Sequence, residues 1–512
     1  MNRIKNAKRN IIWGLFNKIV GIIIPFILRT AVIYYLGREY LGLDSLFNSI
    51  LQMLNIAELG FNSAIVFSMY KPLAIGNDSE VCALLGFYRR VYRIIGVIVL
   101  VLGLSLTPIL PRLIKSGLPK DVNLYLLYFI FLINTVMGYW LFAYKKSLIS
   151  ACQREDIISI TTSTVSVIKI IIQMALLLTI PNYYIFIVVM PLATIAENIT
   201  SQIIALKIFP QYQPYGSISK ESIKSIVTHI KGLIISRICT TSRNSMDSII
   251  ISAYLGLASV TIYGNYYYIL ASIHGILYTI THSISAIVGN TIVKNTPSSN
   301  YKDMLTFNFI YMWLASFCTT CLLCIYQPFM KIWMGDEMLL SNGIMVLFCV
   351  YFYGLCMGDI RSTYYVACGL WWEGRFRSIA EAITNIVLNI LLGKYFGISG
   401  IVIATIISIL VINFGYGSTI IHRYYFKEIS SWMFYKEHLY YAFVTLISSA
   451  ICLYVCSLHH KSGILCIAIN FVICLILSNI CFFIFCCRRQ VFEDARRLII
   501  KVLVPDSTSN KN

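Results

Sequence analysis

The sequence has few charged residues for its length. Only 12% of its 512 residues are Asp, Glu, Lys or Arg, whereas a soluble domain carries roughly 25%. Hydrophobic residues make up 58%, and apolar stretches of about 20 residues, the length that crosses a bilayer, recur along the whole chain. This composition excludes a sizeable soluble domain and predicts an all-α polytopic membrane protein.

The sequence also lacks catalytic motifs and long connecting segments. It contains no Walker A, HExxH or GxSxG pattern and no DxD beside a sugar-nucleotide domain. The sixteen cysteines are scattered through apolar stretches, as expected of reduced thiols that pack as small hydrophobes. Membrane-embedded polymerases of sugar chains commonly carry a large external loop, and none is expected here. We therefore expect a non-enzyme with no cofactor and no metal site.

Acidic residues are scarcer than basic ones, 22 against 41, which gives a net charge of +19. In a soluble protein this excess would suggest nucleic acid. Here the Lys and Arg residues concentrate at alternate ends of the apolar stretches, and segments assigned to the cytoplasm hold roughly four times as many as external ones. The bias predicts an even number of spans with both termini cytoplasmic, and no nucleic-acid partner.

About fourteen spans can be placed on the apolar stretches. Two of them, 42–70 and 222–253, are too polar for hydropathy alone. The predicted spans are 11–36, 42–70, 80–110, 123–149, 156–180, 183–208, 222–253, 259–292, 302–328, 338–368, 376–396, 398–424, 437–457 and 463–487.

The chain resembles itself at an offset of about 220 residues, as parallel transporter repeats do. For example, the triplet Tyr35-Leu36-Gly37 recurs as Tyr254-Leu255-Gly256. The repeat predicts two parallel six-helix bundles followed by two further helices. The expected domains are 1–208 and 222–428 for the bundles, 209–221 for a cytoplasmic linker, 429–490 for the two additional helices and 491–512 for a cytoplasmic tail.

Ionisable residues inside spans are costly, by ~2.5–3.5 kcal/mol each at a helix centre, and are functional hypotheses by default. The embedded cations are Lys18, Arg29, Lys169, Arg237, Arg243 and Arg361. The embedded acids are Asp44, Glu58, Glu197, Asp247, Asp359 and Glu381.

Helical spacing places many of these groups on shared faces. Lys18 and Arg29 are eleven residues apart and so differ by only about 20° around a helix, with Pro25 on the same stripe. The second span carries a polar stripe that includes Asp44, Asn48, Gln52, Asn55, Glu58 and Asn62. The seventh carries another that includes Arg237, Arg243, Asn244 and Asp247. Stripes this long must line water or one another inside a membrane.

The functional interpretation of these faces competes with structural pairing. Arg243 and Asp247 are four residues apart and could neutralise each other, and Lys169 could pair with Glu197. The aromatic run around Asn265 could stack on sugars or form an interfacial belt. We interpret Lys18, Arg29 and Arg237 as substrate-binding cations, because a cationic cavity suits an anionic substrate such as a diphosphate, which arginine binds bidentately. Asp44, Asn55, Glu58, Asn244 and Asn265 are expected to line the cavity, with Asp247 as the coupling candidate.

These segments together resemble the polysaccharide transporter branch of the MOP superfamily, the Wzx-type flippases of O-antigen and capsule synthesis. The resemblance covers about residues 1–490. It rests on 9–30, 35–65, 70–78, 144–157, 247–256, 263–269 and 326–335.

The resemblance implies a MATE-like fold with fourteen spans, two six-helix bundles in a V, and alternating access in a bacterial inner membrane. It implies a polyprenyl-diphosphate-linked oligosaccharide as cargo, membrane lipids and polysaccharide polymerase machinery as partners, and coupling to an H⁺ or Na⁺ gradient. It also implies that Arg243 joins Lys18, Arg29 and Arg237 as a substrate-binding cation, because these residues lie on the spans that line the cavity. A MATE-like antiporter of drugs or metabolites is the alternative function. The two terminal spans and the in-span arginines favour the flippase over that alternative.

Overall fold

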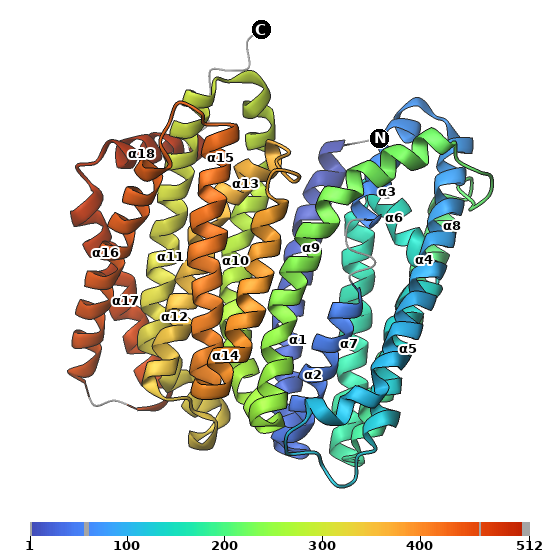
Figure 1. Ribbon diagram of the computed structural model, residues 1–512, viewed down its shortest axis with the longest axis horizontal. Helices are drawn as coiled ribbons and strands as arrows, with labels where there is room; N and C mark the ends of the chain where they lie inside the picture. The colour runs from blue at the N-terminus through green and yellow to red at the C-terminus, as the bar shows by residue number, and fades with distance from the viewer. Residues whose placement is uncertain (1–2, 56–60, 460–461, 504–512) are drawn as a thin grey trace. The chain divides into compact units, whose positions relative to one another are not determined.

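The computed structural model describes residues 3–55, 61–459 and 462–503, and within these ranges it contains helices and no strands. The chain divides into two compact units, Met1–Thr261 and Ile262–Asn512. Figure 1 shows both as bundles of long helices. The all-helical class predicted from composition is therefore confirmed.

The first unit is built from nine α-helices and one 3₁₀ helix among the described residues. They are α1 (Arg3–Tyr35), α2 (Arg38–Leu54), α3 (Phe61–Ile75), α4 (Asp78–Leu106), the 3₁₀ helix η2 (Thr107–Leu113), α5 (Leu124–Trp140), α6 (Ala143–Ala151), α7 (Glu155–Thr179), α8 (Tyr183–Ile208) and α9 (Lys220–Leu255). In three of these helices an asparagine side chain caps the N-terminus by accepting backbone N–H groups: Asn77 in α4, Asn123 in α5 and Asn182 in α8.

The second unit contains most of α10 and all later elements. They are α10 (Leu257–Lys294), α11 (Pro297–Met334), the 3₁₀ helix η3 (Asp336–Met338), α12 (Asn342–Met357), α13 (Asp359–Ala367), α14 (Arg375–Ile407), the π-helix η4 (Ser408–Tyr416), α15 (Gly417–Tyr424), α16 (Ser431–Ser457), α17 (Gly463–Cys486) and α18 (Gln490–Leu503).

Ten helices of the described chain are long and apolar enough to cross a membrane, and α5 with α6, bent by 47°, would make an eleventh. The bend occurs at Phe142, whose backbone is left-handed. Gly397 has φ 60° within α14, at the point where the sequence predicts one span to end and the next to begin. Each predicted span coincides with a helix or with consecutive helices, but the number fourteen stays a prediction.

The surfaces of the bundles are apolar while their interiors contain polar groups. On α16 and α17, Leu446 is 70% exposed and Ile464 is 77% exposed, whereas Asn308 and Asn385 are fully buried. Water would penalise such a surface, and lipid would not. The chain is a multi-pass membrane protein.

The boundary between the compact units differs from the one expected at 209–221, because α9 and the start of α10 pack with the first unit. A backbone N–H at Leu257 donates to the Ser116 carbonyl at 3.1 Å, and the Thr261 hydroxyl donates to the Arg38 carbonyl at 2.5 Å. At Gly42 an added Cβ would stand 2.3 Å from the Leu257 carbonyl oxygen. Only glycine allows this close approach of α2 to the start of α10.

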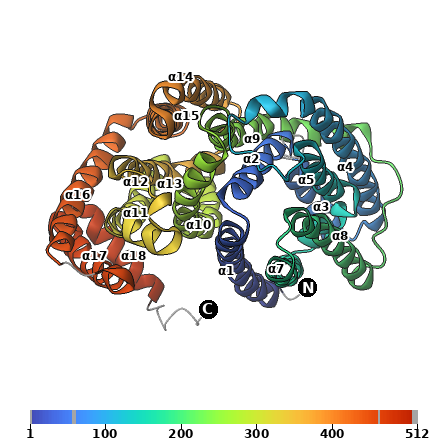
Figure 2. The same ribbon diagram turned by 90° about the horizontal axis from the view of Figure 1, so that it is seen from below.

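Within the first unit, α1 packs along α7, with polar contacts near the N-terminal ends of both helices. Arg9 forms an ion pair with buried Asp156, and the Asn10 side-chain oxygen accepts from the Asp156 backbone N–H at 2.8 Å. Farther along, the Ser163 hydroxyl donates to the Asn17 side chain at 2.9 Å. These contacts fix α1 and α7 as one wall of the first unit, and the view along the helices in Figure 2 shows the two side by side.

Candidate functional site

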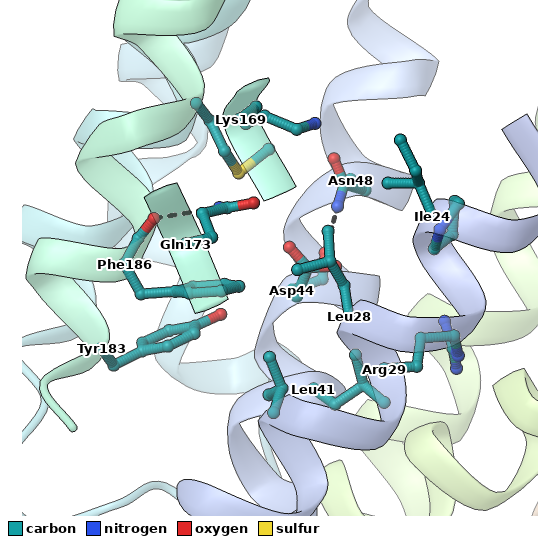
Figure 3. A pocket seen from close by; sticks show the side chains of 13 residues that line it. Ile24, Leu28, Arg29, Leu41, Asp44, Asn48, Lys169, Gln173, Tyr183 and Phe186 are labelled. Carbon is teal, nitrogen blue, oxygen red and sulfur yellow. Dashed lines mark hydrogen bonds between the residues drawn. The ribbon is translucent and has the colours of Figure 1, made fainter. Parts of the chain in front are cut away.

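A pocket of about 200 Å³ lies inside the first unit, between α1, α2, α7 and α8. Its apolar lining includes Ile24, Pro25, Leu28, Val32, Leu41, Phe186 and Met190. Its polar lining consists of Arg29, Asp44, Asn48, Lys169, Gln173 and Tyr183. Figure 3 shows Asp44 and Asn48 on α2 with Gln173 and Tyr183 directed towards them from the opposite wall. We call this space the charged pocket.

The charged pocket has an excess of positive charge. Arg29 from α1 and Lys169 from α7 are its two cations, and Asp44 from α2 is its one acid. Asp44 lies within electrostatic range of both cations. Because one carboxylate can balance only one of them, the lining has a net charge of +1 and would attract an anion.

The uncharged polar groups of this pocket are held by the backbone. The Gln173 amide donates to the Phe186 carbonyl at 3.0 Å, while its side-chain oxygen is buried and has no hydrogen-bond partner within the described chain. The Asn48 amide donates to the Asp44 carbonyl at 2.8 Å. The Tyr183 hydroxyl donates to the Tyr40 carbonyl at 3.1 Å. A buried acceptor such as the Gln173 oxygen costs free energy unless a donor reaches it, and a ligand hydroxyl could supply one.

A second pocket, of about 460 Å³, continues along α2 and shares Asn48 with the first. It has no ionisable side chain except the Tyr139 phenol, and its polar lining consists of amides and hydroxyls: Asn48, Gln52, Asn55, Asn134, Thr135, Tyr139 and Thr194. We call it the amide pocket. Amides and hydroxyls both donate and accept hydrogen bonds, as sugar hydroxyls require.

The polar stripe of α2 connects the two pockets. Asp44, Asn48, Gln52 and Asn55 follow one another at three- or four-residue spacing, so they lie on one helix face that rises by about 16 Å. Glu58, which was expected to continue this stripe, lies outside the described residues.

The substrate-binding cations proposed from sequence do not all lie in these pockets. Arg29 lines the charged pocket, but Lys18 and Arg237 are exposed on α1 and α9. Arg243 is buried on α9, where its Nε donates to the Asn244 side chain at 3.3 Å. The structure therefore brings one of the four cations into the charged pocket.

The residues expected to line the cavity or to couple transport also lie in different parts of the structure. Asp44 lines the charged pocket and Asn55 the amide pocket, while Asn244 is exposed on α9 and Asp247 is buried there. Asn265 is fully buried on α10, in the second unit. It is therefore not assigned to either pocket.

Lys169 and Gln173 are pocket residues that the sequence did not assign. The sequence suggested an ion pair between Lys169 and Glu197, but Glu197 pairs with Lys146 instead. Glu197 accepts from the Lys146 ammonium at 2.6 Å and from the Thr162 hydroxyl at 3.0 Å. The spacing of Lys169 and Gln173, one helical turn apart, could have suggested that they share a face.

Comparison with known proteins agrees with this architecture. A family model described as polysaccharide biosynthesis protein matches residues 7–285. No curated protein matches the sequence.

Among solved structures, the chain is similar to the lipid II flippase MurJ in an inward closed conformation, with 17% identity, 96% of this chain and 99% of that chain covered, and a TM-score of 0.67. It is also similar to an inward-facing multidrug resistance MATE family transporter of the MOP superfamily, with 13% identity, 79% and 95% covered, and a TM-score of 0.63. A Vibrio cholerae MATE transporter, VcmN, gives 14% identity, 84% and 99% covered, and a TM-score of 0.57.

At these identities the solved structures establish the fold, which is that of MurJ and the MATE transporters. The family model covers more than half of the chain. Both findings confirm the resemblance drawn from the sequence, and the chain belongs to the polysaccharide biosynthesis protein family.

Proposed function

We propose that the protein is a flippase that moves polyprenyl-diphosphate-linked oligosaccharides from the cytoplasmic to the outer face of a bacterial inner membrane. The observation that carries this proposal is the sequence of two pockets along α2, one with a net positive charge and one lined by amides and hydroxyls. A diphosphate joined to sugars presents the complementary groups in the same order.

In this proposal the charged pocket receives the diphosphate. Arg29 offers a planar guanidinium that can bind two phosphate oxygens at once, and Lys169 offers a point charge from α7. Asp44 limits the net charge, so that the anion is attracted without being held too tightly to leave. The amide pocket receives the first sugars through Gln52, Asn55 and Asn134.

The alternative of a MATE-like antiporter for cationic drugs is less compatible with these charges. A cationic drug entering the charged pocket would meet Arg29 and Lys169, with Asp44 as its one counter-charge. Like charges at short range cost several kcal/mol in a low-dielectric site, in the order of magnitude that Coulomb's law gives.

We further propose a topology, an energy source and a partner for this flippase in the cell. Both termini would be cytoplasmic, as the distribution of Lys and Arg predicts. Transport would proceed by alternating access without chemical change of the cargo, and an H⁺ or Na⁺ gradient would drive it. A polysaccharide polymerase would receive the exported units.

Deletion of the gene in its host tests this function. We expect lipid-linked repeat units to accumulate, protected from a membrane-impermeant periodate or glycosidase added to intact cells. The parent gene and a Lys331→Gln variant should relieve the accumulation, because Lys331 is 62% exposed and far in sequence from the pockets. Accumulation of units that are accessible from outside would place the defect after flipping and contradict the proposal.

A further inference from the structure

A second group of interacting titratable side chains lies wholly within the second unit. His274 from α10 and Asp359 from α13 are 2.9 Å apart, measured from Nε2 to Oδ2. The Tyr311 hydroxyl from α11 donates to the same Oδ2 at 2.6 Å. The three side chains come from three helices, and the functional site above uses none of them.

The position of Asp359 follows from a break in its helix. Gly358 separates α12 from α13, so Asp359 is the first residue of the new helix. Asp359 therefore lies at the N-terminal end of α13, beside the break. The side chains of His274 and Asp359 are 20% and 13% exposed, and Tyr311 is buried. The pair is therefore largely enclosed by the protein.

Two buried charges near this pair are linked to each other through Asn413. Buried Arg361, on the same helix as Asp359, donates to the Asn413 side chain at 3.0 Å. The Asn413 amide in turn donates to both carboxylate oxygens of Glu381, at 3.1 and 2.9 Å. Further titratable groups near this region are Tyr278 on α10, Cys356 on α12, Tyr365 on α13, Arg377 on α14, His422 on α15 and His438 on α16.

A proton suits the space between His274 and Asp359 better than a metal ion. The ligand atoms of His274, Cys356 and Asp359 lie within 4.8 Å of one another, which permits a metal in principle. However, tetrahedral zinc with bonds near 2.0 Å would hold its nitrogen and oxygen ligands about 3.3 Å apart. The observed 2.9 Å is a hydrogen-bond distance.

We propose that His274 and Asp359, positioned by Tyr311, form the proton-binding site through which a transmembrane proton gradient acts on this transporter. This inference rests on the proposed flippase function and adds the site of its coupling. A proton on His274 converts the hydrogen bond between a neutral imidazole and the Asp359 carboxylate into an ion pair between α10 and α13. Its release weakens that connection beside the break at Gly358. Proton occupancy can thereby bias the arrangement of α10, α11 and α13, as a two-state coupling requires.

The first test measures proton binding without any transport. Purified protein labelled with ¹⁵N at histidine is followed by NMR from pH 5 to pH 8, and the His274 signal is assigned by its loss in His274→Gln. We expect His274 to change from neutral to protonated over this range. In Asp359→Asn it should stay neutral, because the imidazolium would lack its counter-charge near Arg361. A His274 signal that ignores pH, or that titrates equally in Asp359→Asn, would overturn the assignment.

The second test measures coupling in proteoliposomes, with a fluorescent polyprenyl-diphosphate N-acetylhexosamine as the probe. A pH gradient should accelerate flipping by the parent protein and by the control His459→Gln, whose histidine lies beyond the end of α16. It should not accelerate flipping by His274→Gln, which should retain the rate seen without a gradient. Full acceleration of His274→Gln would refute the coupling role. If the parent itself flips no probe, the proposed function fails, and the NMR result still decides whether the pair binds a proton.

Discussion

Neutralising one charge of the charged pocket should change the affinity for a diphosphate in a direction set by the sign of that charge. Arg29→Gln removes a cation from a lining that contains two cations and one acid, and so brings its net charge from +1 to zero. A hydrogen bond to a charged group contributes ~1.5–3 kcal/mol, which corresponds to roughly a 10- to 150-fold change in the dissociation constant. Lys169→Gln should weaken binding in the same direction, by less if its ammonium makes a single contact.

Asp44→Asn provides the test of opposite sign. It keeps the shape of the side chain and the backbone hydrogen bond between Asn48 and the Asp44 carbonyl, but it raises the net charge of the pocket to +2. The diphosphate should bind more tightly and leave more slowly, so that flipping becomes limited by release. A purely structural role of Asp44 would predict weaker binding.

The assay is equilibrium binding of a fluorescent polyprenyl-diphosphate N-acetylhexosamine to purified protein in detergent. The control is Lys331→Gln, which removes one cation from an exposed pair with Asp336 and should leave affinity unchanged. If Arg29→Gln and Asp44→Asn shifted affinity in the same direction, or if Lys331→Gln had as large an effect as Arg29→Gln, the electrostatic account of the pocket would be refuted.

Three further predictions concern the amide pocket, the packing of the first unit and the topology. In the amide pocket, Asn55→Leu should lower the affinity for a probe that carries a sugar, but not the affinity for a sugar-free polyprenyl diphosphate. Equal losses of affinity for the two probes would exclude a sugar contact at Asn55. Gly42→Ala should lower the melting temperature, because its added Cβ would stand 2.3 Å from the Leu257 carbonyl oxygen; overpacking of this kind costs ~1–3 kcal/mol. The control is Gly21→Ala, whose added Cβ would meet nothing within 4 Å. Equal melting temperatures for the two variants would contradict the packing described at Gly42. In a cysteine-free background, an impermeant maleimide added to whole cells should label Ser116→Cys and Lys461→Cys but not Ile75→Cys or Ser150→Cys. The reverse labelling pattern would show the opposite topology. Lys461 itself lies outside the described residues.

The helices of this protein could be predicted from sequence because lipid imposes a simple rule on each segment. An uninterrupted apolar stretch must be helical to satisfy its own backbone in the membrane. The span predicted at 183–208 coincides with α8, Tyr183–Ile208. The break predicted between 396 and 398 coincides with the left-handed Gly397, a conformation that glycine adopts easily.

The composition of the pockets could be predicted only in part, because periodicity defines the face of a helix but not the neighbour it meets. The α2 stripe correctly grouped Asp44 with Asn48, Gln52 and Asn55, since one helix fixes their spacing. The pairing of Glu197 with Lys146 instead of Lys169 depends on how α6 packs beside α8. No single-helix pattern contains that information.

The end of the first unit at Thr261 could not be predicted from the sequence for the same reason. The polar linker at 209–221 is a natural place to divide the chain. However, α9 packs on α2, where the Ser245 hydroxyl donates to the Gln52 side chain at 3.3 Å. Tertiary contacts of this kind involve residues almost two hundred positions apart, which the offset repeat could not reveal.

The central claim is that the protein flips a lipid-linked sugar across a bilayer, and reconstitution tests it most directly. Proteoliposomes containing the purified chain are loaded symmetrically with a fluorescent polyprenyl-diphosphate N-acetylhexosamine, and dithionite is added to quench the outer leaflet. The account predicts that quenching proceeds beyond the outer half with the parent protein, but stops at about half in protein-free liposomes and in liposomes with Arg29→Gln/Lys169→Gln. Quenching that stops at half with the parent protein, in vesicles where the purified chain is folded and correctly inserted, would contradict it.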